Sequence, residues 1–150
     1  MGQCQFILRS VLLMAVFSCC GGINSHTEQH PEQPVTAEAE KLAVLWTSGD
    51  PFVAHKVCFM YTHNAKKAGW WKEVQLIVWG PSSKLLAEDK DLQTAVKAMM
   101  ADGVVVKACK ACADSYGVSD DLAALGIEVK YMGKPLTEML KSDQWQVLTF

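Results

Sequence analysis

The sequence predicts an α/β fold in which helices cover both faces of a mostly parallel five-stranded sheet, a three-layer α/β/α sandwich. Apolar, strand-like runs alternate with helix-like segments five times between residues 41 and 150. Several of these runs are apolar at consecutive positions, which is typical of strands that are buried on both faces. Such alternation favours parallel pairing, because a helix that crosses the sheet joins parallel neighbours.

The first half of the predicted domain holds two strands separated by one long helix. Residues 42–46 form an apolar run, and Ser48 or Asp50 can then cap a helix that begins at Pro51. The helix is expected to end at Gly69, which readily adopts a left-handed conformation. Residues 74–79 follow as the second strand, closed by a turn at residues 80–83. The apolar residues that recur at helical spacing are Val53, Val57, Met60, Tyr61 and Ala68.

The second half continues the same alternation. Apolar residues at helical spacing between positions 92 and 100 predict a helix that ends at Gly103. A short helix capped by residues 119–121 is expected to stop at Gly126. The remaining predicted elements are strands at residues 104–108, 127–132 and 145–150 and a last helix at residues 135–140.

Residues 1–19 are predicted to be a signal peptide of the lipoprotein type. A weakly positive start precedes an apolar run at residues 11–17, which is too short for a permanent bilayer-spanning helix of about 20 residues. The run ends at Ser18-Cys19, which resembles the lipobox of bacterial lipoproteins, so Cys19 is the predicted lipidation site. Cys20 is a second candidate, and a simple secretory signal with two stray cysteines is the alternative interpretation.

The rest of the chain is predicted to be a flexible linker at residues 20–40 followed by one domain at residues 41–150. The linker is poor in apolar residues, and its His26 and His30 stand among glutamates, as in a solvated spacer. The formal net charge is −2 and the only arginine is Arg9, which argues against nucleic acid as a partner. Neither a Gly-x-Gly-x-x-Gly motif nor a P-loop is present, and no cofactor is expected.

Cys109 and Cys112 are the candidate catalytic residues. They form a Cys-x-x-Cys pair where a buried strand should give way to a helix. In a parallel sheet the loops after the strands form the edge at which ligands bind. Amides of the first helical turn, with Lys107 and Lys110, are expected to favour the thiolate of Cys109, which could attack a sulfane sulfur while Cys112 resolves the product.

Other interpretations of these and neighbouring residues stay open at this stage. The two thiols could form an inert disulfide or provide two metal ligands, although no second Cys-x-x-Cys exists to complete a structural zinc site. Cys58 is expected to be a core thiol. His55 could donate a proton or act as a third ligand, or it could be a partly exposed helix residue, and His63 is expected to be solvated.

Serines and tryptophans at the strand ends are the remaining candidates. Ser48, Ser82 and Ser83 are better explained as helix caps than as nucleophiles, because no paired base is evident. Trp46 and Trp79 could form the wall of an apolar pocket beside the thiols, or they could simply belong to the core.

Lys41 to Phe150 resembles the DsrE/DsrF-like family of sulfur-relay proteins. The resemblance rests on the strand ends at residues 47–50 and 79–82, the segment at residues 108–118, and the tail at residues 129–136. It implies that Cys109, which stands eight residues before Gly117, carries sulfur as a persulfide, and that the protein assembles as a trimer or hexamer. The arginines that the family has before that glycine are replaced here by Ser115-Tyr116, and Cys112 is an addition.

These observations predict an exported, periplasmic protein that is held at the membrane only by its lipid. Its expected function is to handle sulfane sulfur or thiol redox chemistry, as a sulfurtransferase or sulfur carrier. Its partners would be proteins or small thiols that donate or accept sulfur. The alternative is a non-catalytic module that uses the same loop to bind a soft metal or another protein.

Overall fold

A computed structural model describes residues 39–150, so the predicted signal peptide and lipidation site at Cys19 lie outside the described residues. The described residues form one five-stranded sheet in the order β4-β3-β2-β1-β5, and every neighbouring pair is parallel. The predicted fold class is therefore confirmed. The strands are β1 (Lys41–Trp46), β2 (Glu73–Val78), β3 (Val105–Cys109), β4 (Glu128–Lys130) and β5 (Trp145–Thr149).

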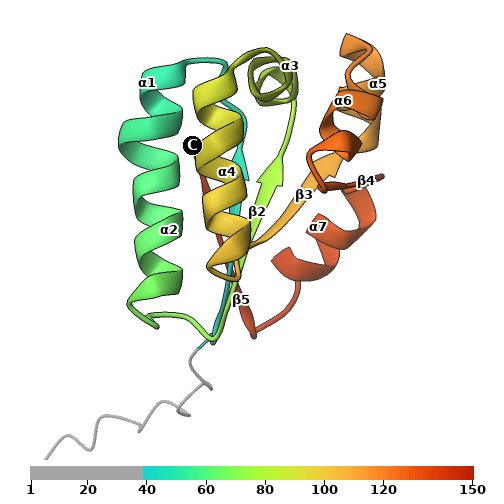
Figure 1. Ribbon diagram of the computed structural model, residues 1–150. Helices are drawn as coiled ribbons and strands as arrows, with labels where there is room; N and C mark the ends of the chain where they lie inside the picture. The colour runs from blue at the N-terminus through green and yellow to red at the C-terminus, as the bar shows by residue number, and fades with distance from the viewer. Residues whose placement is uncertain (1–38) are drawn as a thin grey trace, which may run out of the picture. The chain divides into compact units, whose positions relative to one another are not determined.

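Helices cover both faces of this sheet. Figure 1 shows α2 and α4 side by side at one side of the sheet and α7 at the other side. Among residues 39–150, no helix has the length and apolar character that crossing a membrane requires. The helical elements are α1 (Pro51–Val53), the π-helix η1 (Ala54–Phe59), α2 (Met60–Lys67), α3 (Pro81–Glu88), α4 (Lys90–Ala101), α5 (Lys110–Tyr116), α6 (Ser119–Ala124) and α7 (Gly133–Leu140).

The long helix predicted after Pro51 is present, but a π-helical turn interrupts it. Asp50 caps it, accepting hydrogen bonds from the amides of Phe52 and Val53. A π-turn inserts extra residues into the helical repeat and so rotates the buried face. As a result, Val57 and Met60 from the predicted apolar set are 41% and 57% exposed. The side chains that are buried instead include Ala54, Cys58, Phe59 and Ala65.

The turn predicted after β2 is in fact the start of helix α3. Pro81 occupies its first turn, where a missing amide proton costs nothing. The Ser82 hydroxyl accepts from the Trp79 amide at 2.9 Å and donates to the Trp46 carbonyl at 2.6 Å. Ser82 therefore ties the carboxyl ends of β1 and β2 together, a different role from the helix cap predicted for it.

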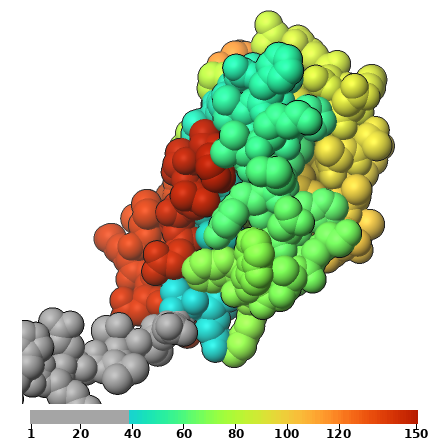
Figure 2. All heavy atoms as spheres, turned by 90° about the vertical axis from the view of Figure 1, so that its left-hand side faces the viewer, coloured from blue at the N-terminus to red at the C-terminus, as the bar shows by residue number. Residues whose placement is uncertain are grey.

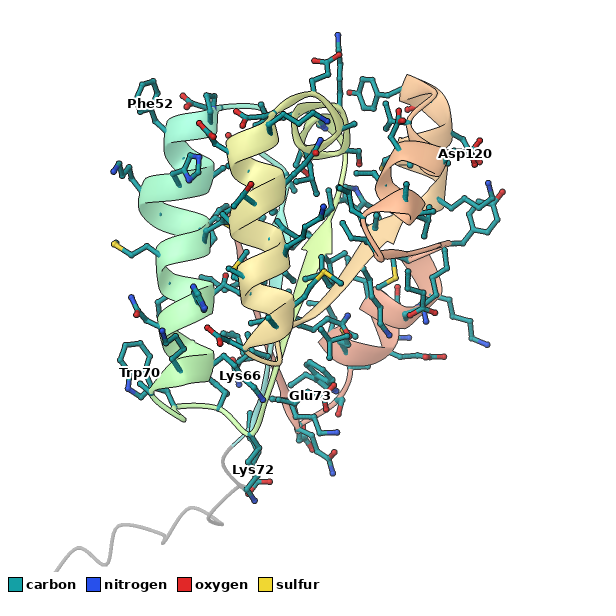
Figure 3. The ribbon with its side chains drawn as sticks, in the orientation of Figure 1. Phe52, Lys66, Trp70, Lys72, Glu73 and Asp120 are labelled. Carbon is teal, nitrogen blue, oxygen red and sulfur yellow. The ribbon has the colours of Figure 1, made fainter. Side chains whose placement is uncertain are left out.

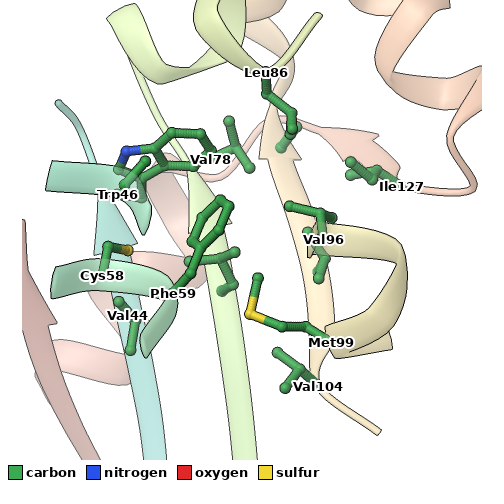
Figure 4. Close-up of a cluster of buried hydrophobic side chains, with 14 of the residues drawn as sticks. Val44, Trp46, Cys58, Phe59, Val78, Leu86, Val96, Met99, Val104 and Ile127 are labelled. Atoms are coloured by element: carbon green, nitrogen blue, oxygen red, sulfur yellow. The ribbon is translucent and has the colours of Figure 1, made fainter. Parts of the chain in front are cut away.

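The two faces of the sheet are covered to different extents. The larger core cluster lies beneath η1, α2, α4 and α6, and Figure 4 shows its Trp46 and Phe59, whose rings meet edge to face with centroids 4.9 Å apart. The other face has a small core cluster, defined here as Ala43, Ile77, Cys109 and Met132. Helix α7 packs over this second face, yet none of its residues is fully buried. Partly exposed apolar side chains therefore surround the small core cluster.

The end of β5 is fixed to the loop that follows β1. The Thr47 amide and hydroxyl both donate to the Phe150 carbonyl oxygen, at 2.7 and 2.8 Å. Figure 2 shows this end of the chain, in red, at the molecular surface. The carboxyl edge of the sheet is thus held together by hydrogen bonds that connect β5, β1 and, through Ser82, β2.

Candidate functional site

The predicted thiol pair lies at the carboxyl edge of the sheet. Cys109 is the last residue of β3 and the N-cap of α5, and Cys112 lies in the first turn of α5. Helix α5 contacts α3, which follows β2, and also contacts β4. Because all five strands are parallel, the loop that holds the two cysteines lies at the same edge of the sheet as the loops that follow neighbouring strands, where sites form in this class of fold.

The two cysteines differ in their access to solvent. Cys109 is 4% exposed and packs with the buried Ala43, Ile77 and Met132 of the small core cluster. Cys112 is only partly buried and lies at the margin of that cluster. Any reagent in solution therefore reaches Cys112 more easily than Cys109.

The two sulfur atoms are close enough for the charge on one to affect the other. Burial is the main cause that raises the pKa of the Cys112 thiol above its ordinary value, and the nearby sulfur of Cys109 raises it further. The backbone amide of Gly80, in the loop after β2, acts in the opposite direction and lowers this pKa. Cys58, Cys109 and Cys112 are free thiols, and they are the cysteines of the described residues.

The two lysines that were expected to support the Cys109 thiolate are each paired with a carboxylate. Both oxygens of Asp114 lie 2.8 Å from the Lys110 ammonium. Lys107 pairs with Glu128 at 3.4 Å. These carboxylates offset much of the positive charge that was predicted for the loop.

Lys130 is the cation that sequence reasoning missed. In the register of β3 and β4 it is the direct partner of Cys109, and its ammonium lies 2.9 Å from the Glu128 carboxylate. The alternating charges of Glu128 and Lys130 are visible in the sequence. Their position beside Cys109 depends on strand order and register, which the sequence pattern does not specify.

The helix that follows Cys109 contributes less than expected. Within α5, all of which is described, no backbone amide donates a capping hydrogen bond to the Cys109 side chain. The helix is also only seven residues long. Any electrostatic support for Cys109 from this helix is therefore limited to unpaired amides that are not aimed at its sulfur.

The two histidines of the described residues, His55 and His63, lie on η1 and α2 and not on the loop that holds the thiols. His55 contacts Phe59, with ring centroids 6.1 Å apart, and lines a shallow groove between α2 and α4. His63 is not merely solvated as predicted, because its Nε2 lies 2.6 Å from the Asp102 carboxylate. Among residues 39–150, no three histidine, cysteine, aspartate or glutamate side chains are grouped so that they could hold a metal ion.

Cys58 and Trp46 lie in the larger core cluster, and Trp79 lies on the other face of the sheet. Cys58 is a fully buried core thiol, as predicted. Trp46 belongs to the larger core cluster, whereas Trp79 packs against the small core cluster on the other face of the sheet, next to Cys112. The two rings therefore do not form the walls of one pocket, and only Trp79 is near the thiols.

A hollow of about 560 Å³ opens at the amino end of the sheet. Figure 3 shows Trp70 and Lys72 at this end of the domain, and Phe52 and Asp120 at the carboxyl end. The lining of the hollow contains no cysteine or histidine and so offers none of the nucleophiles discussed above. It consists of Ala39, Glu40, Lys41, Gly69, Trp70, Lys72, Asp143 and Gln144.

A parallel α/β domain with two neighbouring thiols at the carboxyl edge of its sheet belongs to the class of proteins that can perform thiol chemistry. The chain belongs to the DsrE/DsrF-like family, whose model matches residues 40–150. No curated protein matches the chain.

Two solved structures resemble it. A conserved protein of unknown function from Bacteroides thetaiotaomicron is 40% identical with a TM-score of 0.70, and the match covers 74% of this chain and 95% of that one. The ychN protein of E. coli is 19% identical with a TM-score of 0.55, and the match covers 75% of this chain and 99% of that one. The second likeness concerns the fold alone.

Proposed function

We propose that this protein handles sulfane sulfur, or exchanges thiols and disulfides, through Cys109 and Cys112, with a persulfide formed on Cys109. The observation that carries the proposal is the pair of neighbouring free thiols on one loop at the carboxyl edge of the sheet. Membership of the DsrE/DsrF-like family supports it. The resemblance described from the sequence implies that Cys109, eight residues before Gly117, is the persulfide cysteine. The acceptor and donor are proteins or small thiols.

The proposed chemistry requires only a persulfide donor, R–S–SH. A protein thiolate attacks the outer sulfur of the donor, a new S–S bond forms, and the donor leaves as the thiolate R–S⁻ with the electron pair. If the second protein thiol then attacks the inner sulfur of this persulfide, which belongs to the first cysteine, a disulfide forms between the two cysteines and sulfide leaves. One donor persulfide and two protein thiols thus give one disulfide, one donor thiol and one hydrogen sulfide. Two external thiols then reduce the protein disulfide through a mixed disulfide and leave as one external disulfide.

Intact mass spectrometry of the full chain tests the proposal. After incubation with a small-molecule persulfide, we expect an increment of about 32 Da, the mass of one sulfur atom, located on the peptide that holds Cys109 and Cys112. Cys58 is a matched internal control because it is a free thiol that is fully buried. Absence of this adduct, together with one copper or zinc ion bound per chain, would instead identify a soft-metal-binding module.

We also propose that the domain is exported to the periplasm and anchored there by a lipid on Cys19. The support is the short apolar run that ends at Ser18-Cys19. Intact mass of the membrane-extracted protein should show cleavage before Cys19 and a diacylglyceryl adduct. The Cys19→Ser variant should keep its signal peptide and lack the lipid, and a lipidated variant would refute this assignment.

A homotrimer or homohexamer is the expected assembly. The incompletely covered sheet face supports this proposal, because apolar side chains such as Leu45, Trp145 and Val147 remain partly exposed there. Light scattering of the purified protein measures the assembly directly, and a monomer at all concentrations would contradict it.

A further inference from the structure

We infer that Cys112, rather than Cys109, is the thiol that meets the sulfur donor, and that Cys109 receives the sulfur from Cys112 inside the protein. This inference rests on the proposed function and assigns an order to its two thiols. It reverses the roles that the sequence predicts, in which Cys109 attacks first. Four features of the structure support it.

The first feature is access. Thiol exchange requires the attacking sulfur to approach within bonding distance of the donor sulfur, about 2 Å in the product. Cys109 is 4% exposed, and Ile77 and Met132 beside it are completely buried. A donor could reach that sulfur only by displacing core side chains. Cys112 lies at the margin of the same cluster and is already partly exposed.

The second feature is the contact between α5 and α3, the helix that begins directly after Gly80. The Gly80 amide lowers the pKa of Cys112, although burial, the larger cause, holds that pKa above its ordinary value. Gly80 has a φ of 68° and a ψ of −135°, a combination that only glycine adopts readily. The loop after β2 can present the amide in this orientation because no side chain is present at that position. The Gly80 amide therefore opposes part of the rise in the Cys112 pKa that burial causes.

The third feature is the proximity of Cys109 to Cys112. Cys109 is the N-cap of α5, Cys112 lies in the first turn of that helix, and Cys112 packs against the small core cluster that contains Cys109, so a persulfide on Cys112 places its outer sulfur within reach of Cys109. The Cys109 thiolate attacks that outer sulfur, forming a new S–S bond to Cys109. The bond between Cys112 and the outer sulfur breaks, and Cys112 leaves as a thiolate with the electron pair. No additional oxidant or reductant is needed.

The fourth feature is the burial of Cys109, which protects a persulfide formed on it. A persulfide on the buried thiol is shielded from solvent thiols by the small core cluster, whereas one on Cys112 is open to attack. After transfer, the thiol that holds the sulfur, Cys109, is therefore a different and more buried residue than the thiol that accepts it, Cys112. Lys130, the register partner of Cys109 in β4, is expected to favour a persulfide anion at that position, although Glu128 offsets part of its charge.

Limited alkylation of the full-length reduced protein tests the order of the thiols without any sulfur donor. With iodoacetamide under native conditions, we expect Cys112 to be labelled at least about tenfold faster than Cys109, because a thiol must be accessible to react. Cys58, which is fully buried, sets the rate expected for a core thiol. Labelling of Cys109 as fast as or faster than Cys112 would overturn the inference.

Single-cysteine variants then test the order with a small-molecule persulfide. The Cys109→Ser variant should acquire the sulfur adduct on Cys112 at a rate close to that of the natural chain, and the adduct should be removed rapidly by added thiol. The Cys112→Ser variant should acquire sulfur on Cys109 at least about tenfold more slowly. The reverse pattern would refute the inference. Absence of both a sulfur adduct and a new disulfide between Cys109 and Cys112 in the natural chain would refute the proposed function instead, while the alkylation order would still be measured.

A glycine pair tests the part played by the Gly80 amide. Gly80 and Gly69 have φ values of 68° and 67°, and a Cβ at either position would meet nothing within 4 Å. Gly69 lies at the amino end of the sheet, away from the thiols. We expect Gly80→Ala to slow alkylation of Cys112 severalfold and Gly69→Ala to leave it unchanged. Equal effects of the two variants would show that the amide has no specific role.

Discussion

Lys130 lies directly beside Cys109 in the parallel pair of β3 and β4. Register partners in neighbouring strands project from the same face of a sheet, so the ammonium and the thiol share a face. Glu128 lies between Lys130 and Lys107, at 2.9 and 3.4 Å from their ammonium groups. The hydrogen bond with Lys130 is the largest cause that lowers the pKa of Glu128. These two lysines and one glutamate together carry one net positive charge on the sheet face that also holds Cys109.

Replacing Lys130 should therefore slow the formation of a persulfide on Cys109. We expect Lys130→Met to reduce this rate about twofold to fivefold at low salt, because it removes a partly screened positive charge. Lys134→Met is the matched control, since the Lys134 side chain is 87% exposed and its one ion-pair partner among residues 39–150 is Glu138, at 3.8 Å. Quench-flow mass spectrometry at low and high salt measures both rates. Equal rates for the two variants would show that Lys130 does not act on Cys109.

The pH dependence of Cys112 should change when Cys109 is removed. The pKa of Cys112 is raised first by burial and also by the neighbouring Cys109, so its thiolate fraction rises only at more alkaline pH than for an ordinary thiol. Cys109→Ser removes one of the raising causes and keeps burial. We expect the alkylation rate of Cys112 to increase at lower pH in this variant than in the natural chain.

The measurement is a stopped-flow alkylation profile across neutral and alkaline pH. A model thiol in the same buffers corrects for the pH dependence of the reagent. A profile that moves to higher pH in Cys109→Ser would mean that the Cys109 side chain stabilises, rather than opposes, the Cys112 thiolate.

The fold could be predicted because its signals are local. Apolar runs with turn residues between them identify the five strands, and their alternation with helices indicates parallel pairing. The position of Cys109 at the end of β3 follows from the same pattern. The sequence predicts a turn at residues 80–83, whereas α3 begins at Pro81, because proline is favoured in the first turn of a helix as well as in turns.

The properties of the site could not be predicted because they depend on packing between distant segments. Cys109 is buried by Ala43 and Ile77 of other strands and by Met132 after β4. Lys130 becomes its neighbour only through the register of β3 and β4. The exposed face of the long helix also differs from the prediction, because a π-turn has no clear sequence signal and changes the helical repeat.

Cys58 should make the protein sensitive to alkaline conditions. Burial raises the pKa of this thiol to about 12, with a smaller opposing effect of Thr62. A raised pKa contributes stability that is fully present below the pKa of the unfolded thiol and is lost as pH rises toward 12. If the pKa of this thiol in the unfolded chain is about 8.5, its raised pKa alone should lower the free energy of unfolding by about 2–3 kcal/mol at about pH 10.5, relative to neutral pH.

Urea unfolding of the natural chain and of Cys58→Ala at neutral and alkaline pH checks this expectation. The variant should be less stable near neutral pH, because it leaves a cavity in the core, yet its stability should fall less steeply between about pH 8 and 10.5. An equally steep fall in both proteins would assign the alkaline sensitivity to other groups.

Ser82 and Ser83 are adjacent and both fully buried. Replacing each with alanine should change the stability of the domain in opposite directions. The Ser82 hydroxyl links β1 to the loop after β2 through Trp46 and Trp79, whereas the Ser83 hydroxyl has no hydrogen-bond partner among residues 39–150. Ser82→Ala loses the hydrogen bond donated to the Trp46 carbonyl and should destabilise the domain by about 1–3 kcal/mol. Ser83→Ala removes a buried hydroxyl that is unpaired and should leave stability unchanged or increase it by about 1 kcal/mol.

Urea unfolding at neutral pH compares the two variants directly, and each serves as the control for the other. Because Ser82 holds the edge at which the thiols lie, Ser82→Ala should also make Cys109 easier to alkylate, while Ser83→Ala should not. If Ser83→Ala proved the more destabilising change, its hydroxyl would have to be hydrogen-bonded in solution, for example through a buried water. The carboxyl edge would then depend on a polar network that extends from Ser82 into α3.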